Sequence, residues 1–528
     1  MIEVLRSSWR GIATLIASAG VLGAALIPSP AAAVDWPMFG QNLQNTASTT
    51  TQSFDPETLA VKWTFTTAGD VSARASVANG VVYFPDWGGY IYAVNASNGK
   101  LLWKKQLSAY GLSGSADGNY HSRTTPAVAN GTLYFGTQEG AWLLAVNAAN
   151  GALVWKTQLE SADPFALITA SPSVSNGYVY TGVASNQEAL AAFVPGFVCC
   201  SARGSVVSVN ASTGAVRWKT YTVPDGYSGG GVWGSNLVVD AARGTVYAGT
   251  GNNYSHPSDP AYVACIAGGG TAANCTSPAN HVDSILALDS STGAIRWATK
   301  AVTWNQPGVA DGSDDWNVAC FVPPFTNCPS NSGPDYDFAS APNLITYRDN
   351  NGPHTLLGVG QKSGIYYALN PDTGAVLWRT QVGPGSSLGG MEWGSASDGK
   401  RIYVQIANFY GIPTAVGSGG SWSALDPATG AILWQVGEPS GAISLGPLAV
   451  ADGIVYAPSM AGGATAPSMF ALSANSGQTL WSYASGSSVV AGATVVDGVV
   501  YWGSGYAHLG IPGYTGNNRF YAFSKNGK

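Results

Sequence analysis

The sequence predicts an all-β fold: an eight-bladed β-propeller whose blades each end in tryptophan and whose ring is closed by the N-terminal strand. Two observations predict it. One phrase recurs along most of the 528-residue chain, and the composition suits short strands joined by tight turns. Only 10% of the residues are charged, whereas the chain contains 68 Gly, 18 Trp and 25 Tyr. Glycine permits the positive φ angles of tight turns, and aromatic side chains suit half-buried sheet surfaces.

The recurring phrase has the form (Val/Leu)-(Asn/Asp/Ser)-x-x-x-Gly, and a tryptophan follows the glycine by four residues. Asn or Asp at the start of a turn that closes on Gly is typical of a hairpin, because the side chain caps the turn. The tryptophan then lies on the next strand, where it can wedge between neighbouring sheets. Such a repeat indicates an array of similar supersecondary units. The seven pairs are Gly99/Trp103, Gly151/Trp155, Gly214/Trp218, Gly293/Trp297, Gly374/Trp378, Gly430/Trp434 and Gly477/Trp481.

The two ends of the chain complement each other. The segment Phe520-Tyr-Ala-Phe523 is an eighth phrase that stops before its tryptophan, whereas Trp63 has no phrase before it. The N-terminal strand is therefore expected to complete the blade that begins at the C-terminus, which removes exposed sheet edges. A seven-bladed ring and an open solenoid are the alternatives, and both leave these unmatched ends unexplained.

The N-terminus predicts export. Arg6 and Arg10 precede an apolar run from Gly11 to Ile27, and small residues follow up to Ala33. This pattern is typical of a cleaved signal peptide at 1–33, followed by a propeller over 34–528 and a secreted or periplasmic location; an uncleaved anchor is the alternative. No later stretch approaches about 20 apolar residues, so no membrane span is expected in the mature chain. The net charge of -6 and the lack of a Lys/Arg cluster argue against nucleic acid as a partner.

Six cysteines in an exported chain indicate disulfides. They fall in three local pairs, and free thiols are the less favoured alternative outside the cell. The pairs are Cys199–Cys200, Cys265–Cys275 and Cys320–Cys328.

Long insertions interrupt the middle of the array. The intervals between successive motif tryptophans are 40, 52, 63, 79, 81, 56 and 47 residues, whereas a bare blade needs about 40–50. Loops on such scaffolds commonly carry function. Glu188, Asn252 and Asp337 lie beside strands of consecutive blades and could converge near the axis. Carboxylate and amide oxygens suit Ca²⁺; three unrelated loop residues are the alternative reading.

These blades, with the opening segment that starts at Asp35-Trp36, resemble the pyrroloquinoline quinone (PQQ)-dependent alcohol dehydrogenases, particularly their polyvinyl alcohol dehydrogenase branch. Three non-repeating matches occur in the family's order. Ser185-Asn-Gln-Glu188 and Gly249-Thr-Gly-Asn252 match segments that supply calcium ligands, which implies those roles for Glu188 and Asn252. Tyr336-Asp-Phe-Ala339 matches the segment of the catalytic base and implies that Asp337 is the base and a further metal ligand. A competing match, Asp315-Trp-Asn317, is disfavoured because Asn cannot act as a base.

The same resemblance implies a PQQ site. Trp233 matches the indole under the cofactor, Lys362 a cation near the quinone oxygens, and Arg123 a partner for a PQQ carboxylate. Thr169 and Ser185 match hydroxyls that hydrogen-bond the cofactor. A vicinal Cys199–Cys200 disulfide would form a rigid lid beside it. Two positions depart from the family: Ser72 stands where relatives have Glu, and Glu392 where they often have Asn. Ala339 replaces the second Asp of lanthanide-dependent relatives, which favours Ca²⁺.

The resemblance implies oxidation of secondary alcohols, with polyvinyl alcohol as a candidate, to ketones by hydride transfer to PQQ assisted by Ca²⁺. The sequence contains no Cys-x-x-Cys-His haem motif. An external acceptor such as a cytochrome c is therefore expected to take the electrons. Two alternatives come from other classes: a non-catalytic scaffold of the outer-membrane assembly lipoprotein type, and a cell-envelope protein that binds carbohydrate or cell wall.

Overall fold

The computed structural model describes residues 35–50, 55–234, 236–301, 320, 333–508 and 513–528. The predicted signal peptide 1–33, Cys328 and the competing segment 315–317 lie outside these residues. Among the described residues, no helix is long and apolar enough to cross a membrane.

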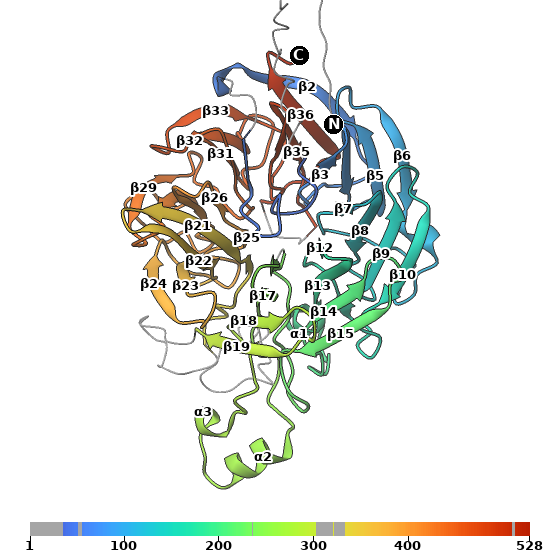
Figure 1. The fold of residues 1–528 in the computed structure, drawn as a ribbon, viewed down its shortest axis with the longest axis vertical. Helices are drawn as coiled ribbons and strands as arrows, with labels where there is room; N and C mark the ends of the chain where they lie inside the picture. Colours follow the sequence, from blue (N-terminus) through green and yellow to red (C-terminus); the bar gives the residue numbers. More distant parts are fainter. Residues whose placement is uncertain (1–34, 51–54, 235, 302–319, 321–332, 509–512) are drawn as a thin grey trace, which may run out of the picture. The chain divides into compact units, whose positions relative to one another are not determined.

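Eight antiparallel sheets follow one another around a centre in sequence order, as Figure 1 shows. In seven of them the strands run outward in chain order, each joined to the next by a short turn or an insertion. In blades 1 to 7 the phrase lies between the third and fourth strands. The pairing of these two strands shifts register there, as between Ala93 and Val94 in the first blade, and the β36–β2 pairing of blade 8 shifts in the same way. The hydrophobic core lies between adjacent sheets, where Tyr83 and Ile91 of the first blade join Leu133 and Leu144 of the second.

The strands are grouped by blade as follows. Blade 1 holds β3 (Ser76–Ala78), β4 (Val81–Pro85), β5 (Tyr90–Asn95) and β6 (Leu101–Gln106); blade 2 holds β7 (Ala127–Ala129), β8 (Thr132–Gly136), β9 (Trp142–Asn147) and β10 (Leu153–Gln158). Blade 3 holds β12 (Ser173–Ser175), β13 (Tyr178–Ser185), β14 (Ser205–Asn210) and β15 (Val216–Tyr221), with β11 (Ala166–Leu167) added to β13; blade 4 holds β16 (Val238–Asp240), β17 (Thr245–Gly249), β18 (Ser284–Asp289) and β19 (Ile295–Lys300). Blade 5 holds β21 (Asn343–Asp349), β22 (Gly352–Gly360), β23 (Ile365–Leu369) and β24 (Val376–Gln381); blade 6 holds β26 (Ala396–Ser397), β27 (Ile402–Ile406), β28 (Ser421–Leu425) and β29 (Ile432–Gly437). Blade 7 holds β30 (Ala449–Ala451), β31 (Ile454–Pro458), β32 (Met469–Ser473) and β33 (Thr479–Tyr483), with β1 (Ser48–Thr49) added to β30; blade 8 holds β34 (Thr494–Val496), β35 (Val499–Gly503), β36 (Arg519–Lys525) and β2 (Leu59–Thr66).

The predicted closure is confirmed in blade 8. The N-terminal strand β2 pairs with the C-terminal strand β36 from Leu59–Lys525 to Thr66–Arg519, and Trp63 lies opposite Ala522. Figure 1 shows the two strands side by side, blue against red. The ring thus joins its own ends by a ladder of hydrogen bonds and leaves no unmatched sheet at the start of the array.

Each motif tryptophan reaches the turn of the next blade, so the repeat also ties the blades together. The indole Nε1 of Trp63 donates to the Ala96 carbonyl at 3.0 Å, and that of Trp481 donates to the Leu59 carbonyl at 3.0 Å across the closure. The phrase glycine lies under the neighbouring ring: a Cβ on Gly99 would come within 2.7 Å of Trp63. Glycine is therefore needed both for its positive φ and for this close approach.

Gly99→Ala is expected to lower the free energy of unfolding more than Gly80→Ala in the same blade. Both glycines have positive φ, of 71° and 74°, but a Cβ on Gly80 would meet nothing within 4 Å. The control should lose about 1–2 kcal/mol from backbone strain alone, and Gly99→Ala about 1–3 kcal/mol more from overpacking. Urea unfolding of both variants measures this difference; equal losses would show that the Trp63 contact contributes nothing.

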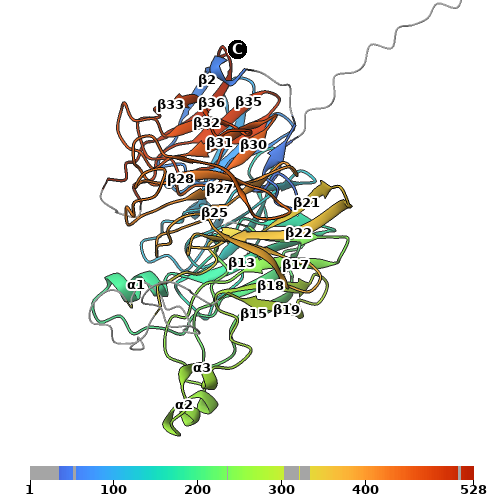
Figure 2. The same ribbon diagram turned by 90° about the vertical axis from the view of Figure 1, so that its left-hand side faces the viewer.

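In the described part of the chain, three short α-helices and two 3₁₀ helices lie in the connections: α1 (Gln187–Phe193), α2 (Pro260–Ala267), α3 (Ala272–Cys275), η1 (Pro56–Thr58) and η2 (Leu107–Tyr110). The segment with α2 and α3 extends away from the ring in both Figure 1 and Figure 2. The predicted disulfide Cys265–Cys275 joins these two helices and is confirmed, as is Cys199–Cys200. Cys320 is also disulfide-bonded.

Candidate functional site

A buried ion cluster lies where the loops of blades 4 and 5 meet. Lys362, in the turn between β22 and β23, places its Nζ 3.0 Å from Asp337 Oδ1 and 3.2 Å from Asp335 Oδ1. All three residues are buried, with Lys362 5% exposed and each aspartate 1%. Desolvation of an ion costs several kcal/mol unless it is paired, so the two carboxylates and the ammonium stabilise one another.

The charge state of Lys362 follows from these neighbours. Burial alone would lower its pKa, but the carboxylates of Asp335 and Asp337, with those of Glu188 and Glu392, raise the pKa of Lys362 well above its usual range. Lys362 is therefore a permanent cation at neutral pH. More carboxylates than cations surround it, a balance that suits an additional divalent cation.

Trp233 and Asn252 complete the cluster. Trp233, in the loop before β16, donates from Nε1 to Asp337 Oδ2 at 2.9 Å, and Lys362 Nζ lies 5.0 Å from its ring centroid. Asn252, after β17, donates from Nδ2 to Asp335 Oδ1. Its own Oδ1 is buried and accepts no hydrogen bond within the described chain, nor does Asp337 Oδ1, which faces the Lys362 ammonium. A buried amide oxygen without a donor, such as Asn252 Oδ1, is the kind of ligand that a hard cation binds.

Glu188 lies at the border of this cluster, on the first turn of α1. Its charge acts on Lys362, and burial, Glu188 and Asp337 in that order raise the pKa of Tyr254. Among the described residues, no group of three or more His, Cys, Asp or Glu is arranged to hold a metal; an amide such as Asn252 does not count in such a group. The structure thus brings Asn252 and Asp337 into one cluster and Glu188 within electrostatic reach of it.

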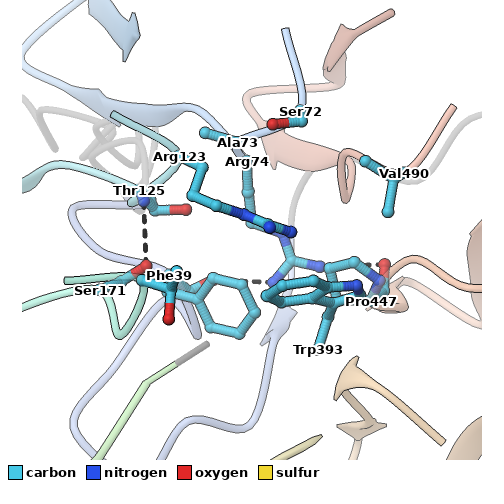
Figure 3. A pocket seen from close by; sticks show the side chains of 11 residues that line it. Phe39, Ser72, Ala73, Arg74, Arg123, Thr125, Ser171, Trp393, Pro447 and Val490 are labelled. Carbon is cyan, nitrogen blue, oxygen red and sulfur yellow. Dashed lines mark hydrogen bonds between the residues drawn. The ribbon is translucent and has the colours of Figure 1, made fainter. Parts of the chain in front are cut away.

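A pocket beside the cluster contains two arginines. Arg123, before β7, stacks its guanidinium 4.0 Å from the ring centroid of Trp393, and Figure 3 shows it together with Ser72 and Arg74. Arg74 is buried, and its guanidinium donates to the Phe39 and Leu448 carbonyls at 2.7 Å. Burial lowers the pKa of Arg74 to about 9. The Arg123 guanidinium on the face of Trp393 suits a flat ligand that carries a carboxylate, whereas the donors of Arg74 are taken by backbone carbonyls.

Trp393 connects the pocket to the ion cluster. Its backbone amide donates to the Ala339 carbonyl at 3.0 Å, because β20 (Ser340–Ala341) and β25 (Trp393–Gly394) pair in parallel. Its ring meets that of Trp233 edge to face, with centroids 5.6 Å apart. Thr169 Oγ1 donates to the Trp233 carbonyl at 2.7 Å and lines the same pocket. Pocket and cluster therefore form one continuous site.

Ser185 and the Cys199–Cys200 disulfide both contact the Tyr254–Ser255 segment. The hydroxyl of Tyr254 donates to the Ser185 carbonyl at 3.4 Å, and Cys199 Sγ lies 3.5 Å from the Tyr254 carbonyl. Ser255 Oγ donates to the Cys200 carbonyl at 3.0 Å. The disulfide thus lies against the chain that leaves Asn252. Its proposed contact with a cofactor stays a prediction.

Glu392 adds a titratable group to the site. Burial raises the pKa of Glu392 to about 7, against the opposing effects of Lys362 and Arg123. A carboxyl whose pKa is raised on folding stabilises the fold below about pH 4.5, and this contribution is lost as the pH rises to about 7. Glu392→Gln, which stays neutral, is expected to be more stable than the wild type by on the order of 2 kcal/mol at pH 8 and equally stable at pH 4.5.

Urea unfolding between pH 4.5 and 8 measures this difference. The exposed Glu57→Gln serves as the control and should follow the wild type at every pH. A Glu392→Gln curve that runs parallel to the wild type would show that Glu392 does not titrate in this range.

Three residues of the site were missed in the sequence: Asp335, Arg74 and Trp393. Asp335 forms an Asp-x-Asp pair with Asp337, and Trp393 is a tryptophan outside the repeat phrase, so both carried a signal. Arg74 carried none, because its environment arises from Phe39 and Leu448, which are far from it in sequence.

The comparisons with known proteins concern the chain as a whole. A PQQ-repeat family model, described as outer membrane protein assembly factor BamB, matches residues 47–265 and 418–528. The chain belongs to the PQQ-repeat propeller family. Two relatives named polyvinylalcohol dehydrogenase, from Sphingopyxis sp. (strain 113P3) and Pseudomonas sp., are 29% and 28% identical over 85% and 86% of the chain. The matches cover 68% and 70% of those proteins.

The fold of this PQQ-repeat propeller also matches that of a quinohemoprotein alcohol dehydrogenase from Comamonas testosteroni, with a TM-score of 0.67 and 18% identity over 94% of this chain and 81% of that one. The resemblance to PQQ-dependent alcohol dehydrogenases is confirmed. The BamB model leaves residues 266–417 unmatched. That interval contains Asp335, Asp337, Lys362 and Trp393, which form the cluster and its connection to the pocket.

Proposed function

We propose that this PQQ-repeat propeller oxidises secondary alcohols to ketones, with polyvinyl alcohol as the candidate polymeric substrate, and uses PQQ and Ca²⁺. The observation that carries the proposal is the buried Asp337 carboxylate, which lies between the Lys362 ammonium and the Trp233 indole. The relatives named polyvinylalcohol dehydrogenase support the substrate class.

The residues divide into two sets. Trp233 would provide the face on which PQQ lies, Arg123 would pair with one of its carboxylates, and Thr169 and Ser185 would bind its polar edge. Glu188, Asn252 and Asp337 would hold the Ca²⁺. When bound, PQQ supplies a hydride acceptor and Ca²⁺ supplies Lewis acidity.

The chain's own chemistry is proton transfer at Asp337. Its carboxylate would take the hydroxyl proton of the alcohol as a general base, which requires a fixed and ionised group within hydrogen-bond reach. Trp233 Nε1 holds Oδ2 in place. Lys362 Nζ holds Oδ1 from 3.0 Å. Lys362 also supplies positive charge where negative charge develops on oxygen.

The route of the electrons is a further part of the proposal. An external acceptor such as a cytochrome c would take them, at a secreted or periplasmic location.

A non-catalytic scaffold is the second candidate, because the matching family model carries the description of an assembly factor. The site argues against it. A buried Lys362 with two carboxylates costs several kcal/mol of desolvation per ion, and a scaffold that binds partners through its surface gains nothing from it.

Reconstitution distinguishes the two. Purified full-length chain, treated with a chelator, is mixed with PQQ and Ca²⁺ and followed by its visible spectrum and by dye reduction with a secondary alcohol. The enzyme proposal expects saturable PQQ uptake and alcohol-dependent dye reduction. A chain that takes up no PQQ would contradict the enzyme proposal.

A further inference from the structure

Asp335 is buried at the centre of the cluster, although it is neither a predicted metal ligand nor the predicted base. It is 1% exposed and has a positive φ of 60°, so the backbone there adopts a conformation that is uncommon outside glycine. Its Oδ1 accepts a hydrogen bond from Asn252 Nδ2, and the Lys362 Nζ lies 3.2 Å from the same oxygen. Asp335 therefore contacts two other side chains of the site, those of Asn252 and Lys362.

The contact with Asn252 determines which way the amide faces. An ionised carboxylate can only accept hydrogen bonds. Asn252 must therefore turn its NH₂ group toward Asp335 and its Oδ1 away from it. The structure shows this Oδ1 buried and without a hydrogen-bond donor in the described chain. A buried acceptor without a partner destabilises the folded protein, and a cation at that oxygen would offset this cost.

The contact with Lys362 has a second effect. Lys362 Nζ lies between the two carboxylates, at 3.0 Å from Asp337 and 3.2 Å from Asp335. The Lys362 ammonium therefore pairs with both carboxylates and not with Asp337 alone.

We propose that Asp335 is a positioning residue for the cation site: it orients the Asn252 amide so that Oδ1 faces the metal, and it shares Lys362 with Asp337. This inference rests on the proposed calcium site. Groups that hold a metal ligand from behind typically contribute 10–100-fold to metal affinity.

The first test measures Ca²⁺ affinity without PQQ or substrate. Chelator-treated full-length protein is titrated with CaCl₂ by calorimetry. Asp335→Leu, which removes both acceptors at similar volume, is expected to weaken Ca²⁺ binding about 10–100-fold. Asp335→Asn, which keeps the shape and polarity, should weaken it in the same direction and less, and it decides the test if the leucine variant does not fold. Asp240→Leu is the matched control: Asp240 is also buried, in blade 4, and pairs with Arg243 at 2.9 Å. Its Ca²⁺ affinity should equal that of the wild type.

The second test separates orientation from charge. In an Asn252→Asp background no amide needs orienting, and two carboxylates repel each other. Removal of Asp335 from that background should leave Ca²⁺ binding equal or tighter. If Asp335 acted only through its charge, its removal would weaken binding in both backgrounds, and this result would overturn the proposal.

Failure of this inference is distinguishable from failure of the proposed function. Wild-type protein that binds no Ca²⁺ would refute the calcium site itself and the inference with it. Wild-type protein that binds Ca²⁺, together with Asp335 variants of unchanged affinity, would refute the positioning role alone.

Discussion

Asp337→Asn is expected to lower alcohol turnover about 10³-fold while the protein still folds and takes up PQQ. A general base typically contributes 10²–10⁴-fold, and an amide cannot accept the hydroxyl proton. The amide oxygen can still accept the hydrogen bond from Trp233 Nε1, which in the wild type is 2.9 Å long. The shape of the site is therefore kept while its basicity is lost.

The dye-linked assay with a small secondary alcohol measures turnover, and absorbance titration measures PQQ uptake in the same preparation. Asp240→Asn, at a buried aspartate that pairs with the partly exposed Arg243 in blade 4, is the control and should keep full turnover. Turnover of Asp337→Asn at the wild-type rate would remove Asp337 from the base role. Loss of PQQ uptake would instead place it among the groups that hold the cofactor.

Lys362→Met is expected to have the largest effect on stability. It leaves two buried carboxylates without their shared cation, and removal of one partner from a buried pair costs about 3–5 kcal/mol. Lys362 is 5% exposed and Asp335 and Asp337 are 1% exposed, so water cannot replace the lost ammonium. Added Ca²⁺ should recover part of the loss, because a divalent cation at the same carboxylates restores positive charge.

Urea unfolding of the chelator-treated variant, with and without Ca²⁺, checks both statements. The control is Arg296→Met, because Arg296 forms a 2.7 Å pair with Asp289 and its side chain is 40% exposed. That pair should contribute about 1 kcal/mol or less. An equally small loss in Lys362→Met would show that the cluster does not depend on its lysine.

The fold could be predicted closely because the same Gly/Trp phrase occurs seven times along the chain. The glycine and tryptophan of each phrase serve one geometry, in which the indole Nε1 donates to a carbonyl of the next turn. A single instance would be ambiguous, but seven instances in order indicate an array. The orphan Trp63 and the incomplete phrase at Phe520 then indicate a closed ring, which the β2–β36 ladder confirms. The second role of the phrase glycine, as the surface under the neighbouring ring, required the contact between blades.

Site residues could be predicted where they lie in non-repeating segments that match the PQQ-dependent alcohol dehydrogenases. Asp337, Lys362, Trp233 and Asn252 meet in one buried cluster, and Thr169 and Arg123 line the adjoining pocket. The roles assigned to these residues, to Glu188 and to the Cys199–Cys200 disulfide stay predictions. Asp335 could not be given its place from the sequence, because its significance depends on two partners, 83 and 27 residues away along the chain.

The sequence by itself determined the ring, its eight blades and its closure, because local turn chemistry and one tryptophan contact are repeated in every blade. Only the tertiary structure decided the site. Trp233 and Asp337 are 104 residues apart and yet share a hydrogen bond. Asp335 becomes a partner of Lys362 only when blade 5 brings its turn against the segment before β20. Burial and pairing set the charges of such groups, and both arise from contacts between distant segments that no local pattern in the sequence specifies.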